Sequence, residues 1–133
     1  MTDEKKIIEY VLLAFFTEER EWEKLCDHNL MSDSEREKVI NSIFDKYCVP
    51  KERKYGDLAI RSYGNDGIYN YDPSSENIES INITGSKAIV TTIKKEPFRE
   101  SFQYVLRKTK KGWLIDSKKI YSTWKQKWER AIL

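Results

Sequence analysis

The chain has 133 residues, 39% of them apolar and 35% charged, a composition typical of a single soluble domain over residues 1–133 with a sizeable core. The longest apolar run, Tyr10–Phe16, is far shorter than the roughly 20 residues of a membrane span, and the charged N-terminus does not resemble a secretory signal, so we expect a cytoplasmic protein without a membrane partner. The net charge is only +2 and acids are scattered among the bases, which argues against a specific nucleic-acid partner.

Two amphipathic helices are predicted over about residues 3–49. The first runs from Asp3 to about Asn29, because its apolar residues recur mostly at three- and four-residue steps. The second starts at the Ser-Asp-Ser-Glu sequence of residues 32–35, which fits a capping box, and Pro50 ends it.

The two cysteines, Cys26 and Cys48, fall on the apolar stripes of these helices, so we expect buried free thiols. The single histidine, His28, has no further ligands at a metal-binding spacing, and the sequence predicts no metal site. A glycine-rich phosphate loop and a nucleophile elbow are also absent from the sequence, so we expect no cofactor.

Residues 50–75 form an irregular segment that is broken by glycines and proline and rich in tyrosine. We expect a short helix or turn, followed by a short strand near Gly67–Tyr71. The tyrosines either provide a binding surface or cover the domain's own core, and both interpretations stay open.

From about residue 76 to 121 the pattern predicts an antiparallel sheet. The expected strands are Ile78–Thr84, Lys87–Lys95, Phe98–Lys108 and Gly112–Tyr121. The connections are two to four residues long, so consecutive strands should pair as a meander. Helices followed by a sheet define an α+β protein with the helices packed on one face of the sheet.

Residues 122–133 form an aromatic tail. On a helical register Trp124, Trp128 and Ile132 share one stripe, with Tyr121 close to it. Such a large apolar surface must be covered, either by the protein's own sheet or first helix, or by a partner or a second copy of the chain.

Charge is divided unevenly along the chain. Residues 1–50 carry 12 acidic and 7 basic side chains, whereas residues 51–133 carry 10 acidic and 17 basic ones. The basic half either steers a charged partner or protects the edges of the sheet from aggregation.

Three of the strand segments, Ile81–Ile93, Phe102–Lys108 and Gly112–Ser117, resemble the closing strands of the nuclear transport factor 2-like, or cystatin-like, cone. The resemblance implies N-terminal helices packed on a strongly curved antiparallel sheet. The tail, Ser117–Leu133, is similar to the ending of a bacterial group of this fold, the immunity proteins of polymorphic toxin systems. That similarity implies a non-enzymatic protein that binds and neutralises a cognate toxin domain.

With a toxin domain as the implied partner, we expect the contact surface to include the basic strand-turn and the aromatic tail, where tryptophan and arginine are common hot spots. A homodimer is a further possibility for the same fold. The candidate partner-binding residues are Arg107, Lys110, Lys111, Tyr121, Trp124, Trp128 and Arg130.

An alternative function is that of a small-molecule binder or an isomerase- or cyclase-like enzyme of the same cone fold, which would hold an acid or base inside the cone. Asp116 is the candidate carboxylate, with Tyr104 or Tyr10 as hydrogen-bond donors. Strand alternation, however, places Asp116 opposite Trp113 and Ile115, away from the interior if those two residues line it. The fold itself does not decide between binding and catalysis.

Overall fold

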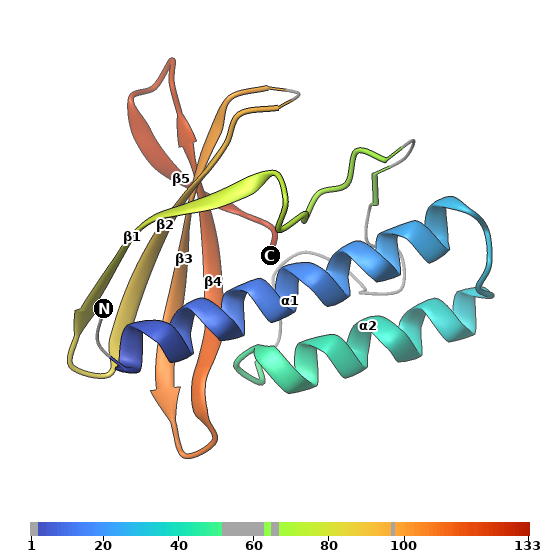
Figure 1. The fold of residues 1–133 in the computed structure, drawn as a ribbon, viewed down its shortest axis with the longest axis horizontal. Helices are drawn as coiled ribbons and strands as arrows, with labels where there is room; N and C mark the ends of the chain where they lie inside the picture. Colours follow the sequence, from blue (N-terminus) through green and yellow to red (C-terminus); the bar gives the residue numbers. More distant parts are fainter. Residues whose placement is uncertain (1–2, 52–62, 65–66, 97) are drawn as a thin grey trace.

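The computed structural model describes residues 3–51, 63–64, 67–96 and 98–133. Two helices precede five strands: α1 (Asp3–Asp27), α2 (Asp33–Tyr47), β1 (Glu76–Thr84), β2 (Lys87–Lys94), β3 (Glu100–Thr109), β4 (Gly112–Ser122) and β5 (Lys127–Ala131). The strands form one antiparallel sheet in the order β1-β2-β3-β4-β5. The sheet is strongly bent, and both helices lie on the same face of it (Figure 1). The predicted α+β architecture is confirmed.

The link between the two helices is closed by local hydrogen bonds. At the end of α1, Asn29 adopts a φ of 54°, and the Leu30 N–H donates to the carbonyl of Leu25 at 2.9 Å, as in a Schellman motif. At the start of α2 the predicted capping box is present, because Ser32 Oγ accepts from the Glu35 N–H at 3.2 Å and Glu35 Oε1 accepts from the Ser32 N–H at 3.3 Å. These two motifs allow α2 to turn back alongside α1.

The helix α2 ends at Tyr47, before Pro50, the residue that the sequence predicted would end it. Cys48 leaves the helix in an extended conformation and forms a parallel bridge with Ile115 on β4, and the Val49 N–H donates to the carbonyl of Ile115 at 2.8 Å. Tertiary pairing with the sheet therefore ends the helix before the proline can.

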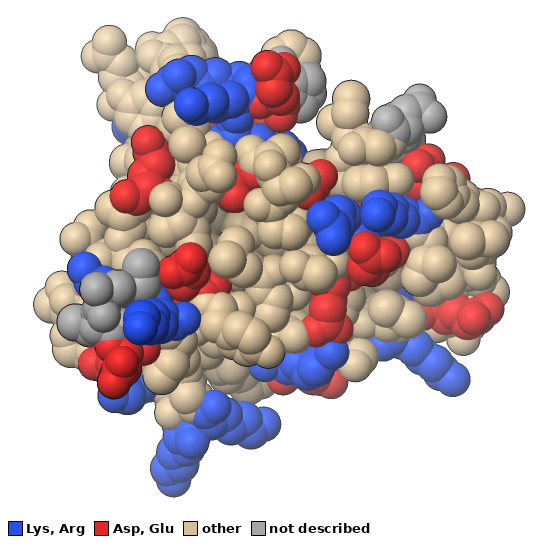
Figure 2. Space-filling model, in the orientation of Figure 1, with Lys and Arg blue, Asp and Glu red and all other residues tan. Residues whose placement is uncertain are grey.

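Polar contacts link the two helices to each other and join α1 to the segment before β1. Glu18 on α1 accepts from Lys46 and Tyr47 on α2, and Arg20 reaches Asp72 at 3.3 Å. Burial and the hydrogen bond to Glu18 raise the pKa of Tyr47 to about 12. Acidic and basic side chains are accordingly mixed over the helical side of the molecule (Figure 2).

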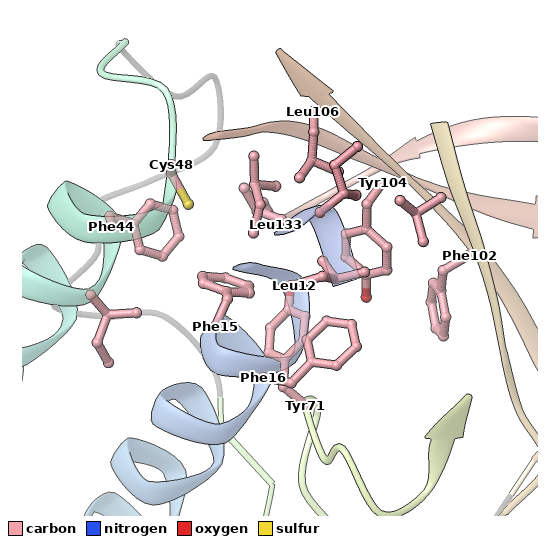
Figure 3. Packing of buried hydrophobic residues seen from close by; sticks show 14 of the residues in the cluster. Leu12, Phe15, Phe16, Phe44, Cys48, Tyr71, Phe102, Tyr104, Leu106 and Leu133 are labelled. Atoms are coloured by element: carbon pink, nitrogen blue, oxygen red, sulfur yellow. The ribbon is translucent and has the colours of Figure 1, made fainter. Parts of the chain in front are cut away.

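The core lies between α1 and the concave face of the sheet (Figure 3). Phe16 stacks on Tyr71 with ring centroids 5.6 Å apart and lies 5.3 Å from the ring of Tyr104. Each large apolar side chain that is fully buried in this way stabilises the fold by about 1.5–3 kcal/mol. Cys26 and Cys48 belong to the same core as buried free thiols, which confirms that prediction.

The expectation of a helical register for the tail is wrong. Residues 123–126 turn, and β5 then pairs with β4 so that Trp128 lies opposite Tyr121. The free edge of β4 offers a row of backbone donors and acceptors. Pairing with this edge satisfies the backbone hydrogen bonds of the tail, as a helix would. In the strand, Trp128 also gains an aromatic partner. Leu133 beyond β5 enters the core beside Leu106 and Cys48 (Figure 3). The tail thus joins its own sheet as the edge strand, while Trp124 stays 84% exposed and Ile132 61% exposed.

A buried carboxylate holds the irregular segment that precedes β1. Glu23 on α1 is 1% exposed and accepts backbone N–H groups from Gly64 at 2.9 Å, Asn70 at 2.7 Å and Tyr71 at 3.0 Å. Gly64 is required there, because a Cβ atom on it would lie 2.0 Å from the carbonyl oxygen of Ile68. One acidic side chain therefore supplies acceptors for three backbone N–H groups of the described part of this segment.

Two of the tyrosines in this segment cover the core. Tyr69 and Tyr71 are buried, and Lys94 on β2 donates to the carbonyls of Tyr69 at 2.9 Å and Asn70 at 3.3 Å. The predicted strand at Gly67–Tyr71 is reduced to a single bridge residue, Ile68, because the backbone there bonds to side chains of α1 and β2 instead. The short helix or turn expected before that strand falls where residues 52–62 lie outside the described part of the chain.

The role of Glu23 can be tested by Glu23→Gln. The substitution removes the negative charge that strengthens three backbone hydrogen bonds, and it directs a side-chain N–H group toward backbone N–H donors. We therefore expect the unfolding free energy to fall by about 2–3 kcal/mol. Urea denaturation measures this change. The control is Glu21→Gln on the exposed side of the same helix, which should alter stability by about 0.5 kcal/mol at most. Equal stability of the two variants would contradict the anchoring role.

Candidate functional site

The pairing register divides the side chains of β3, β4 and β5 between two faces. Tyr104 pairs with Lys118 and Phe102 with Ile120 on the face that meets the helices. The residues between them point the other way, onto what we call the outer face of the sheet. The outer face carries Arg107 from β3, Lys119 and Tyr121 from β4, and Trp128 and Arg130 from β5.

Aromatic and basic side chains meet on the β4–β5 part of this outer face. The rings of Tyr121 and Trp128 pack edge-to-face with centroids 5.2 Å apart, and both side chains are half-buried. Lys119 and Arg130 lie opposite each other on β4 and β5 and are exposed. An apolar centre beside exposed cations is the arrangement expected of a surface that binds a protein of opposite charge.

The structure brings only some of the predicted partner-binding residues together. Tyr121, Trp128 and Arg130 are neighbours, whereas Lys110 and Lys111 form the β3–β4 turn at the opposite end of the sheet from Trp124. At about 3.3 Å per residue, the length of β4 separates the two turns by roughly 35 Å. Lys and Arg side chains accordingly project at both ends of the sheet (Figure 2). The predicted set forms two groups rather than a single patch.

The alternative catalytic residues do not meet. A register shift between Val105 and Leu106 leaves Asp116 as an extra residue of β4, and its carboxylate accepts from Lys51 at 3.0 Å and pairs with Arg107 at 3.6 Å. The hydroxyl of Tyr104 lies on the concave side. The other suggested donor, Tyr10, is 71% exposed on α1. The geometry therefore puts Asp116 beside the cations Lys51 and Arg107. Tyr104 instead faces Glu76, and Tyr10 faces solvent.

A buried polar cluster, not predicted from the sequence, occupies the interior instead. Glu76 is 1% exposed, and its Oε2 atom accepts from Thr92 at 2.6 Å and from the Tyr104 hydroxyl at 2.9 Å. The Nζ atom of Lys118 lies 4.4 Å from the centroid of the Phe102 ring and 5.7 Å from that of Tyr104. We call Glu76, Thr92, Tyr104 and Lys118 the interior cluster. It takes one side chain from each of the strands β1 to β4 and so ties their registers together.

Burial dominates the electrostatics of the interior cluster. Desolvation raises the pKa of Glu76 above its ordinary value of 4.5, although the hydrogen bonds from Thr92 and Tyr104 and the charge of Lys118 oppose that rise. Burial and the neighbouring Glu76 carboxylate also raise the pKa of Tyr104 well above 10.0. Local sequence patterns did not predict this cluster, because Glu76 precedes the predicted start of its strand at Ile78.

Two further kinds of site were sought in the described part of the chain. No group of three or more His, Cys, Asp or Glu side chains there is arranged to hold a metal ion. Neither of the two helices combines the length and the apolar character that crossing a bilayer requires, as judged on the described residues.

The bent antiparallel sheet with both helices on its concave side is that of a cone-shaped α+β protein (Figure 1). The profile of the family described as NTF2 fold immunity protein matches residues 7–131, and the chain belongs to this family. It is 30% identical over 91 residues to a protein of Dickeya dadantii (strain 3937) named Immunity protein RhsIA. That match covers 68% of this chain and 65% of the relative's length. No solved structure gives a significant match.

The interior cluster predicts a pH dependence that Glu76→Gln should remove. A carboxylic acid whose pKa is raised by folding stabilises the native state below its unfolded pKa, and this contribution is lost as pH rises through the folded pKa. Relative to the wild type, the glutamine variant should therefore gain unfolding free energy as pH rises from about 4.5 upward. Urea denaturation at a series of pH values measures the difference.

The matched control for this measurement is Glu79→Gln, an exposed glutamate on the same strand. Its stability should follow that of the wild type across the same pH range. If the unfolding free energies of Glu76→Gln and the wild type differ by the same amount at every pH, burial does not raise the pKa of this carboxyl group.

Proposed function

We propose that the protein is a non-enzymatic immunity protein, which binds a cognate toxin domain and neutralises it in the cytoplasm of the cell that produces both. The observation that carries this proposal is the match of the NTF2 fold immunity protein family over residues 7–131. The name of the Dickeya dadantii relative supports it independently. The partner is then a protein, and neutralisation is a matter of occupying its working surface.

The outer face is the surface we assign to this contact. Tyr121 and Trp128 provide an apolar centre, and the exposed cations Lys119 and Arg130 lie beside it. Arg107 is on the same face but farther along the sheet, opposite Leu114. These side chains stand on paired strands rather than on long loops, so little conformational entropy is lost when a partner covers them. The basic residues favour a partner with an acidic contact surface and speed its approach.

Protection of a cell also sets a requirement on affinity. A toxin that acts catalytically must be almost fully bound, which requires a dissociation constant in the nanomolar range or lower, about −12 kcal/mol. An interface of ordinary size, about 800 Å² on each partner, provides that affinity when it contains buried aromatic anchors. The outer face and its aromatic pair are consistent with such an interface.

Co-expression with the toxin domain encoded beside this protein tests the proposal. The wild type should restore growth and form a complex, whereas the charge reversal Lys119→Glu with Arg130→Glu should weaken binding about tenfold to a hundredfold by placing like charges against an acidic partner. Growth rescue and isothermal titration calorimetry are the measurements. The same reversal at Lys110 and Lys111 shows whether the contact extends to the β3–β4 turn.

The control for charge reversal is Lys38→Glu, on the exposed side of α2, which should leave both rescue and affinity unchanged. Absence of rescue and of a complex with the wild-type protein would contradict the proposed function. If the outer-face reversal instead converts a dimer of this chain into a monomer, measured by light scattering, the outer face serves self-association and the toxin contact lies elsewhere.

A further inference from the structure

Two aromatic side chains stand in solvent at the same end of the sheet. Trp124 is 84% exposed and Phe98 is 75% exposed, and these are the highest values among the large apolar side chains that the structure describes. Phe98 lies in the β2–β3 connection and Trp124 in the β4–β5 connection. Because the strands are antiparallel, both connections project from one end of the sheet, away from the β3–β4 turn (Figure 1).

The turn that carries Trp124 is held in place by several interactions. The Lys125 N–H donates to Ser122 Oγ at 3.3 Å, and Lys125 Nζ pairs with Glu129 at 3.0 Å. Gln126 adopts a φ of 53°, which closes the turn tightly enough for β5 to pair with β4. The Nζ atom of Lys125 lies 5.9 Å from the centroid of the Trp124 ring. Trp124 is therefore exposed on a fixed support, as an anchor for a partner should be.

Positive charge surrounds the two aromatic rings. Lys95 and Arg99 flank Phe98 in the sequence, Lys125 and Lys127 follow Trp124, and all four side chains are exposed. A nearby glutamate, Glu96, is exposed among them. Interspersed charge of this kind suits a protein surface better than a phosphate backbone, which favours an uninterrupted run of cations.

We propose that these two connections act as a fork that inserts Phe98 and Trp124 into an apolar groove with an acidic rim on the toxin domain. The fork comprises Lys95, Phe98, Arg99, Trp124, Lys125 and Lys127. This inference rests on the proposed function and adds a second contact region beyond the outer face. It assigns the two rings to apolar anchoring and the four cations to recognition of carboxylates around the groove.

Binding of the purified, catalytically inactive toxin domain encoded beside this protein is the test. Trp124→Ala and Phe98→Ala should each weaken the affinity about thirtyfold or more, as loss of an anchor does. The reversal Lys125→Glu with Lys127→Glu should lower the association rate about tenfold and make it less sensitive to salt. Surface plasmon resonance separates these effects, and thermal unfolding confirms that each variant is folded.

Tyr10→Ala is the matched control, because Tyr10 is an aromatic side chain of similar exposure, 71%, on α1 and far along the chain from the fork. It should bind like the wild type. If the wild type binds and the fork variants behave like Tyr10→Ala, the fork is overturned while the proposed function stands. If the wild type neither binds nor protects, both fail together. Binding of a labelled single-stranded RNA that Trp124→Ala abolishes, with toxin binding intact, would assign the fork to nucleic acid and overturn the inference.

Discussion

The strand β4 is the element on which the rest of the structure depends, because three different parts of the chain use its backbone. One edge pairs with β3 over residues 112–120, apart from the extra residue Asp116. The other edge is divided: β5 pairs with residues 118–122, and the segment that leaves α2 bridges to Ile115. The tail and the end of the second helix therefore take their positions from one strand. Without those pairings the backbone of β5 would lack hydrogen-bond partners in the fold, and the Tyr121–Trp128 contact would not form.

The second constraint is that charged side chains inside the cone need hydrogen-bond or aromatic partners. Glu23 accepts from three backbone N–H groups of the segment before β1, and Lys94 donates to two of its carbonyls, so the described part of this segment is held by both a helix and a strand. The interior cluster then joins the strands β1 to β4 across their pairing direction. Buried charges cost desolvation, and they are tolerated here because each has polar or aromatic partners that favour one arrangement of the chain.

These constraints connect the scaffold to its proposed role. The concave side of the sheet is filled by helix, aromatic side chains and the interior cluster. The outer face and the ends of the hairpins present side chains on a backbone that the interior has already fixed. A protein built this way is suited to binding a second protein with little rearrangement, which is the property that neutralisation by occlusion needs.

The sequence by itself determined the order and type of the helices and of the strands β1 to β4. Helical periodicity, the capping box at residues 32–35 and the short connections between strands are local signals, and the helices and the four predicted strands appear where these signals place them. The buried cysteines followed from the same periodicity. These features could be predicted because each depends on residues a few positions apart.

Tertiary structure alone decided the rest. The tail reads equally well as a helical stripe, and only the free edge of β4 makes it a strand, so that Trp128 packs on Tyr121 while Trp124 stays in solvent. Likewise, Tyr104 meets Glu76 rather than Asp116, because the bend of the sheet and the extra residue in β4 set which side chains face the interior. Contacts between distant segments depend on register and curvature, which no local pattern in the chain encodes.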